Sequence, residues 1–133
     1  MDQEAKVTLT GNTYQVSIAA RGHRWLSDEP KDFGGTDTAP QPGELLLSSL
    51  GACTAITIKM YANRKKWPVD NIEVEVRFNS AARPDPLTTV IDMDIHLTGN
   101  LSQEQRDRLL QIARSCPVHK MLSNPIIMNT KAI

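Results

Sequence analysis

Two segments of the chain alternate strictly between apolar and polar side chains. Residues 72–78 place an apolar side chain at every second position, and residues 91–97 repeat the pattern. An alternation of period two predicts a strand with one face against a core. Three shorter segments predict further strands: residues 7–9, 14–18 and 23–26. Residues 11–12, Gly-Asn, predict a hairpin turn between the first two strands.

The strongest helical segment covers residues 44–66. It begins after a Pro-Gly pair with Glu44 in its first turn and ends in an Arg-Lys-Lys run, which suits the helix dipole at both ends. Between residues 45 and 60 the only charged side chain is Lys59. Such a helix has almost no polar face, so we expect it to be buried on nearly all sides, in the middle of a fold or of a subunit interface.

The C-terminal part predicts two helices and a strand. Residues 102–105, Ser-Gln-Glu-Gln, are typical of a capping box, and apolar residues at helical spacing follow them. The Cys116–Pro117 pair ends that helix and begins another, because proline is favoured at the first helical position. Residues 126–128 predict a last strand. This order of elements indicates the α+β class, and no linker divides residues 1–133, so we expect a single domain.

Composition and charge narrow the function classes. A chain of 133 residues can bury one sizeable core without disulfides or metals. Fifteen basic and fifteen acidic side chains give no net charge, which argues against a nucleic-acid binder that depends on bulk positive charge. The chain has no run of 18 apolar residues, and its acidic start lacks a signal-peptide core, so we expect neither a membrane partner nor secretion. The expected location is the cytoplasm.

The chain has two cysteines, Cys53 and Cys116. Most cysteines in cytosolic domains are small buried hydrophobes, which is the simplest interpretation of Cys53 on its apolar helix. Cys116 is predicted to cap a short helix, where backbone N–H groups favour a thiolate. As a pair, two thiols fit peroxide reduction, in which one sulfur becomes a sulfenic acid and the second condenses with it to a disulfide.

Metal binding is a rival use of the same side chains. Cys116 and His119 are separated by two residues, and Cys53 is a third candidate ligand. A single pair is weak evidence, because strong zinc signatures contain two such pairs. Residues 34–37, Gly-Gly-Thr-Asp, match no phosphate-binding pattern.

Several motifs together resemble the OsmC/Ohr family, and its OsmC-like branch most. The resemblance covers nearly the whole chain, and both cysteines fall within matching motifs. The motifs are residues 28–30 (Asp-Glu-Pro), 34–40 (Gly-Gly-Thr-Asp-Thr-Ala-Pro), 44–47 (Glu-Leu-Leu-Leu), 51–54 (Gly-Ala-Cys-Thr), 61–68 (Tyr-Ala-Asn-Arg-Lys-Lys-Trp-Pro) and 116–120 (Cys-Pro-Val-His-Lys).

The resemblance implies an intertwined homodimer in which two sheets wrap around long central helices, with active sites at the subunit interface. It implies a thiol-dependent hydroperoxide reductase that serves oxidative or osmotic stress defence. Cys53 would attack an organic hydroperoxide and Cys116 would resolve the product to a disulfide. A dithiol or a lipoylated protein would then reduce the disulfide, and no metal, flavin or haem cofactor is implied.

Two positions depart from the hydroperoxide resistance branch of that family. The catalytic glutamate of that branch lies ten residues before the attacking cysteine, a position that Gly43 holds here, so Glu44 is the expected supporting acid one residue later. No arginine stands in residues 10–14, where that branch has its catalytic arginine; Arg21 and Arg24 are the nearest. The alternative function is therefore a non-enzymatic dimer that binds a small apolar ligand at the subunit interface.

Overall fold

The computed structural model describes residues 2–133 and has the predicted α+β class. Its contacts divide the chain into two compact units, the first ending at Leu46 and the second running from Leu47 to Ile133. Each unit contains one antiparallel sheet, so the expectation of two sheets is confirmed. The expectation of one domain over residues 1–133 stays a prediction.

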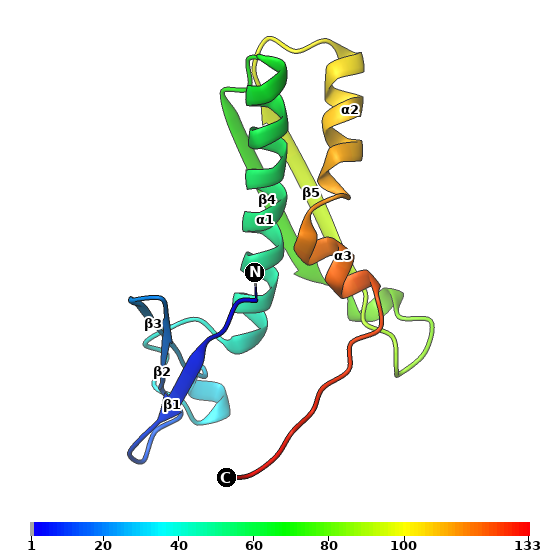
Figure 1. Ribbon diagram of the computed structural model, residues 1–133. Helices are drawn as coiled ribbons and strands as arrows, with labels where there is room; N and C mark the ends of the chain where they lie inside the picture. The colour runs from blue at the N-terminus through cyan, green and yellow to red at the C-terminus, as the bar shows by residue number, and fades with distance from the viewer. Residues whose placement is uncertain (1) are drawn as a thin grey trace. The chain divides into compact units, whose positions relative to one another are not determined.

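The first unit contains a three-stranded sheet in the order β1-β2-β3. Its strands are β1 (Lys6–Leu9), β2 (Val16–Ala20) and β3 (His23–Ser27), which confirms the three predicted N-terminal strands (Figure 1). The register pairs Ile18 with Val7 on one side and with Trp25 on the other. Gly11 in the β1–β2 turn has a φ of 90°, a conformation that favours glycine.

A buried carboxylate organises the loop between β3 and the first long helix. This loop contains the short 3-10 helix η1 (Lys31–Phe33). Asp28 is 1% exposed, and its carboxylate accepts hydrogen bonds from the Thr36 hydroxyl (2.6 Å), from the Thr38 hydroxyl (2.8 Å) and from two backbone N–H groups. The Asp-Glu-Pro and Gly-Gly-Thr-Asp-Thr motifs are thus joined by one side chain.

These hydrogen bonds make the loop sensitive to acid. The Thr36 hydroxyl, followed by the N–H groups of Thr38 and Glu29, holds the pKa of Asp28 far below its usual range, against the opposing effect of burial. A carboxylate with a depressed folded-state pKa stabilises the fold above its unfolded pKa of about 3.9, and this stability is lost as the pH falls toward the folded value.

We therefore expect the melting temperature of the wild type to fall steeply below about pH 4. The Asp28→Asn variant should melt at a lower temperature near neutral pH, because an amide offers one acceptor oxygen in place of two. Its melting temperature should also depend less on acid. Thermal unfolding followed by circular dichroism at a series of pH values tests this, and an equally steep acid dependence in the variant would contradict it.

The second unit packs helices on one face of a two-stranded hairpin, as Figure 1 shows. Its elements are the body of α1 (Pro42–Lys65), β4 (Asn71–Phe78), the short 3-10 helix η2 (Ser80–Ala82), β5 (Ile91–Thr98), α2 (Gln103–Ala113) and α3 (Pro117–Ser123). The predicted strands at residues 72–78 and 91–97 are confirmed, and the register pairs Val74 with Ile95.

The core of this unit lies between α1, α2 and the hairpin. Ile58 and Ala62 of α1 meet Leu109 and Ala113 of α2, and all four are at most 2% exposed. Apolar side chains of the inward face of β4–β5 pack against this cluster, as the alternating pattern predicts. The α2 capping box is also present, since the Ser102 hydroxyl accepts the Gln105 N–H at 3.1 Å.

Helix α1 is only partly buried in a single chain. One stripe at four-residue spacing is buried, namely Leu50, Thr54, Ile58 and Ala62. On another face Ile56 is 54% exposed and Met60 is 68% exposed, so burial on nearly all sides would need a subunit interface, which stays a prediction. By length and composition alone α1 is apolar enough to span a membrane, a property that core helices of globular proteins share.

The predicted last strand at residues 126–128 is wrong. These residues follow α3 without regular secondary structure, and Ile127 and Met128 are more than 80% exposed. A strand forms only where a neighbouring strand offers hydrogen bonds, so an apolar sequence alone does not produce one.

Candidate active site

Cys53 lies in the middle of α1, on the part of the helix that packs closely against β4. The preceding Gly51 allows this approach, because a Cβ atom there would lie 3.2 Å from Cγ2 of Val76. Cys53 itself is half-buried and is a free thiol. Cys53 therefore lies at the edge of the core rather than within it.

Cys116 caps α3 as predicted. It lies two residues beyond the end of α2, precedes Pro117 at the first helical position, and is completely buried. Its Sγ accepts the backbone N–H of His119 at 3.4 Å. The capping position therefore holds the Cys116 sulfur where it accepts a hydrogen bond from a backbone N–H group.

The fold brings the two cysteines together from opposite ends of the second unit's sequence. The side chains of Cys53 and Cys116 lie near each other, since each thiol shifts the pKa of the other, and both are free thiols. Sequence spacing gave no information on this proximity. A disulfide between them requires their Cα atoms to come within about 7 Å.

The two thiols differ in acidity. Burial, followed by the hydrogen bond with Cys116, raises the pKa of the Cys53 thiol. Burial also opposes ionisation of Cys116, but hydrogen bonds from Cys53, from the N–H groups of His119 and Val118, and from Thr54 outweigh it and lower the pKa of Cys116. Cys116 is therefore the more acidic of the two thiols.

No basic side chain is among the main groups that shift the pKa of these thiols in the part of the chain that the structure describes. Within residues 2–133, the principal contributions to either thiol's pKa come from burial, from the other cysteine, from backbone N–H groups, and from the hydroxyls of Thr54 and Thr57. Sequence analysis missed both threonines. The signal that identifies them is a hydroxyl residue within four positions of Cys53 on an otherwise apolar helix.

The expected supporting groups belong to the first unit. Glu44 lies in the first turn of α1, where its Oε1 accepts the N–H of Gln41 at 2.9 Å. Arg21 occupies the β2–β3 turn with a φ of 52°, and Arg24 lies on β3. The roles of Glu44 and of a substitute arginine stay predictions.

A pocket of about 270 Å³ lies between the end of α3, β5 and α1. Its lining includes Leu50 one turn before Thr54, Met93 of β5, and His119, which follows Cys116 on α3. The Met93 sulfur also accepts the Thr54 hydroxyl at 3.6 Å. This pocket therefore adjoins the residues that surround the cysteine pair, and its lining is partly apolar.

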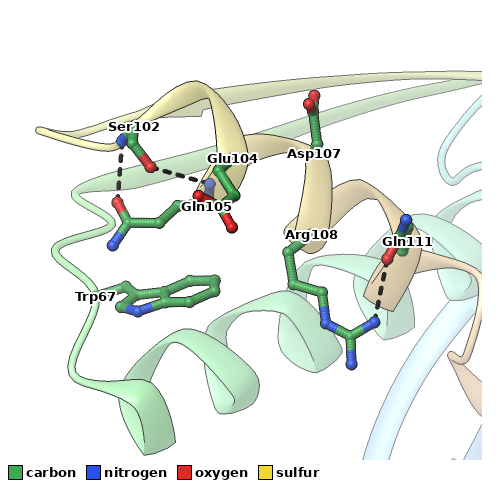
Figure 2. A pocket seen from close by; sticks show the side chains of 7 residues that line it. All are labelled: Trp67, Ser102, Glu104, Gln105, Asp107, Arg108 and Gln111. Carbon is green, nitrogen blue, oxygen red and sulfur yellow. Dashed lines mark hydrogen bonds between the residues drawn. The ribbon is translucent and has the colours of Figure 1, made fainter.

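A larger pocket of about 690 Å³ lies between α2 and Trp67, the second residue after the end of α1 (Figure 2). The Trp67 ring forms one wall, and polar side chains of α2 form the other. Trp67 also packs edge-to-face on Tyr61, at 5.6 Å between ring centres, and Arg108 donates to the Tyr61 hydroxyl at 3.1 Å. This pocket contains no thiol, so it is separate from the cysteine pair.

The structure does not favour the metal alternative at the cysteines. Among residues 2–133, the group whose ligand atoms lie within 4.8 Å of one another is Glu73, Glu75 and His96, on the polar face of β4–β5. All three are exposed, and His96 Nε2 lies 3.6 Å from Glu75 Oε1 as in an ordinary surface pair. Cys53, Cys116 and His119 form no such group.

Known proteins match this chain in sequence and in fold. The family model described as OsmC-like protein matches residues 35–131. A Psychrobacter arcticus protein named for osmotic stress and detoxification responses shares 26% identity, with 88% of this chain and 85% of that chain covered and a TM-score of 0.74.

Two further solved structures share the fold. An OsmC-like protein of Mycoplasma pneumoniae is 18% identical, with coverage of 92% and 88% and a TM-score of 0.78. An organic hydroperoxide resistance protein of Legionella pneumophila is 21% identical, with coverage of 92% and 89% and a TM-score of 0.66. No protein of curated function matches the chain. The family match includes both cysteine motifs, and the chain belongs to the OsmC-like protein family.

Proposed function

We propose that this protein is a cysteine-dependent hydroperoxide reductase that acts on organic hydroperoxides. The observation that carries the proposal is that two free thiols, Cys53 and Cys116, lie near enough to shift each other's pKa. A half-buried cysteine beside a fully buried one suits the pairing of an accessible nucleophile with a protected resolving thiol. Relatives named for organic hydroperoxide resistance support the same reaction class.

The cycle has two bond exchanges. The Cys53 thiolate attacks the distal oxygen of the hydroperoxide, the O–O bond breaks, the alkoxide leaves as an alcohol after protonation, and Cys53 becomes a sulfenic acid. The Cys116 thiolate then attacks the Cys53 sulfur, an S–S bond forms, and hydroxide leaves as water after it takes a proton. A dithiol, free or as the lipoyl group of a protein, reduces the disulfide by thiol–disulfide exchange.

The first step requires that Cys53 loses its proton although its pKa is raised. The more acidic Cys116 lies beside it, so a thiolate there accepts the proton of Cys53 and leaves the charge on the sulfur of the more exposed residue. Cys116 then gives this proton to the departing alkoxide, which leaves as the alcohol, and the Cys116 thiolate that remains is the resolving group. Glu44 is the proposed supporting acid.

Three further features belong to the proposal. The exposed apolar face of α1 supports a homodimer, because exposed Ile56 and Met60 lie on one side of a core helix. The partly apolar pocket beside α3 offers room for a small organic group of the substrate. A cytoplasmic location suits a cycle that depends on a dithiol reductant.

Oxidation with one equivalent of cumene hydroperoxide tests this function. We expect rapid loss of both thiols and a disulfide between Cys53 and Cys116, located by mass spectrometry of the digested protein. The same experiment with hydrogen peroxide at the same concentration shows whether the protein reacts faster with an organic hydroperoxide, as the proposal expects. Thiols that remain reduced after an hour with cumene hydroperoxide would contradict the proposal.

One observation favours the alternative, a non-enzymatic dimer that binds a small apolar ligand. The raised pKa of Cys53, with no basic side chain among its principal contributors in residues 2–133, reduces the thiolate available for attack. This alternative expects unreactive thiols and an apolar molecule that copurifies with the protein. The same oxidation experiment distinguishes the two functions.

A further inference from the structure

Three positive charges surround the ring of Tyr61, near the C-terminal end of α1. The guanidinium carbons of Arg64 and Arg108 both lie 5.4 Å from the ring centre, and the Lys65 ammonium nitrogen lies 5.7 Å from it. Arg108 also donates a hydrogen bond to the Tyr61 hydroxyl at 3.1 Å. We call these four residues the Tyr61 cluster. It gathers three cations around one ring in a chain that has no net charge.

The charges of the Tyr61 cluster are not neutralised by carboxylates. Both ion pairs found among residues 2–133 lie on β4–β5, so neither involves the cluster. Arg64 and Lys65 suit the negative end of the α1 dipole, but Arg108 belongs to α2 and adds a charge that this dipole does not explain. Its Nε donates to Tyr61 and its Nη1 to Gln111 at 3.1 Å, which leaves Nη2 without an acceptor in the described part of the chain.

An aromatic wall adjoins this positive charge. Trp67 packs edge-to-face on Tyr61, at 5.6 Å between ring centres, and both rings pack against the buried core, so they form a firm surface. Trp67 forms one wall of the pocket of about 690 Å³, and Arg108 and Gln111 line it from α2 (Figure 2). The pocket therefore offers one ligand both an aromatic face and cationic N–H donors.

We propose that the pocket between Trp67 and α2 binds an aromatic anion, that is, a flat ring that carries one carboxylate. The ring stacks on the indole of Trp67, and the carboxylate accepts hydrogen bonds from Arg108 at the edge of the Tyr61 cluster. A guanidinium suits this role because its planar N–H groups match the geometry of a carboxylate. This binding does not depend on the proposed reductase activity, since the pocket contains no thiol.

Two carboxylates of α2 limit the charge of the ligand. Asp107 accepts the side-chain amide of Gln103 at 2.8 Å and points away from Trp67 in Figure 2. Glu104 lines the pocket one turn before Arg108, on the same face of α2. Its charge opposes an anion, but the three cations of the Tyr61 cluster outnumber it. A monoanion therefore fits this pocket better than a dianion or an organic cation.

Nuclear magnetic resonance of the full chain measures this binding, with benzoate as the probe. The chain contains two tryptophans, so the Trp25→Phe variant identifies the indole N–H resonance of Trp67. We expect benzoate to shift this resonance in a saturable way. Benzamide has the same ring without the charge, and acetate has the charge without the ring, so each should bind about tenfold more weakly than benzoate.

Four variants test the part played by charge. Arg108→Gln should weaken benzoate binding about tenfold, because it removes a hydrogen bond to a charged group. Lys65→Gln should weaken it about threefold, since this exposed ammonium acts through its charge alone. Glu104→Gln should tighten it about threefold, because it removes the opposing charge. Arg114→Gln is the matched control: it removes an exposed arginine at the end of α2 outside the Tyr61 cluster, and it should leave binding unchanged.

Each of several results would overturn the proposal. Weaker benzoate binding in Glu104→Gln would indicate a site for a cation, and equal effects of Arg108→Gln and Arg114→Gln would show that the Tyr61 cluster plays no part. Inorganic phosphate that binds more tightly than benzoate would indicate a site for a plain anion. A Trp67 resonance that benzoate does not shift would refute the site itself.

The test does not rest on one variant. If Arg108→Gln does not fold, as judged by circular dichroism, Lys65→Gln and Glu104→Gln carry the same comparison, because both change the charge of exposed side chains. The titration uses no peroxide, so its result is independent of the reductase activity. Wild-type thiols that resist cumene hydroperoxide would refute the proposed function and leave the benzoate result intact.

Discussion

Replacing Cys53 with serine is expected to abolish catalytic reduction of organic hydroperoxides, with a loss of turnover of at least about a thousandfold. A serine hydroxyl has nearly the same size but remains protonated at neutral pH, and it does not form a sulfenic acid. Cys53 is half-buried whereas Cys116 is fully buried, so the remaining thiol is poorly placed to replace it. The test is the steady-state rate of peroxide consumption with a dithiol reductant, compared between the wild type and Cys53→Ser.

Cys116→Ser is the matched control for this result. It keeps the accessible sulfur, so it should consume one equivalent of peroxide per chain and then stop unless the reductant attacks the sulfenic acid directly. Excess peroxide should carry Cys53 on to the sulfinic acid, which mass spectrometry detects as two added oxygen atoms. Equal turnover in the wild type and Cys53→Ser would refute the assignment of Cys53 as the nucleophile.

The acidity of the two thiols is where the structure adds most to the sequence. The family resemblance implies that Cys53 is the nucleophile, and the predicted helix cap favours a thiolate at Cys116. In the structure Cys116 caps α3 and hydrogen bonds lower its pKa, whereas burial raises the pKa of Cys53. Only the three-dimensional structure shows that the more acidic thiol lies near the proposed nucleophile.

Local patterns predicted the elements whose determinants are local. The alternation in β4 and β5, the capping box of α2 and the Cys116–Pro117 start of α3 are each set by a few neighbouring residues, and each was correct. The wrong prediction of a last strand and the partial exposure of α1 have a common cause. Residues 126–128 and the exposed face of α1 are apolar sequences whose partner surfaces are not supplied by the described single chain. An apolar pattern predicts burial, but it does not specify which chain provides the cover.

That common cause leads to a prediction about assembly: Met60→Glu should convert the proposed homodimer into a monomer. Met60 is 68% exposed in one chain and lies one turn from Ile56, which is 54% exposed. Covering two such side chains contributes about 1.5–3 kcal/mol each, and a carboxylate at the same place would be buried without a partner, at a cost of several kcal/mol. Light scattering after size-exclusion chromatography should give the mass of two chains for the wild type and of one for the variant.

Leu110→Glu is the control. Leu110 is also an apolar helix residue with much of its surface exposed (44%), but it lies on α2 and not on α1. It should retain the mass of the wild type. A wild type that has the mass of one chain, or a Met60→Glu variant that stays dimeric, would contradict the prediction.

The same variants link assembly to activity. If the active site needs both subunits, Met60→Glu should lose hydroperoxide turnover, although Cys53 and Cys116 lie within one unit of one chain. If turnover persists in the monomer, the cysteine pair and its threonines suffice, and the dimer serves stability by covering α1.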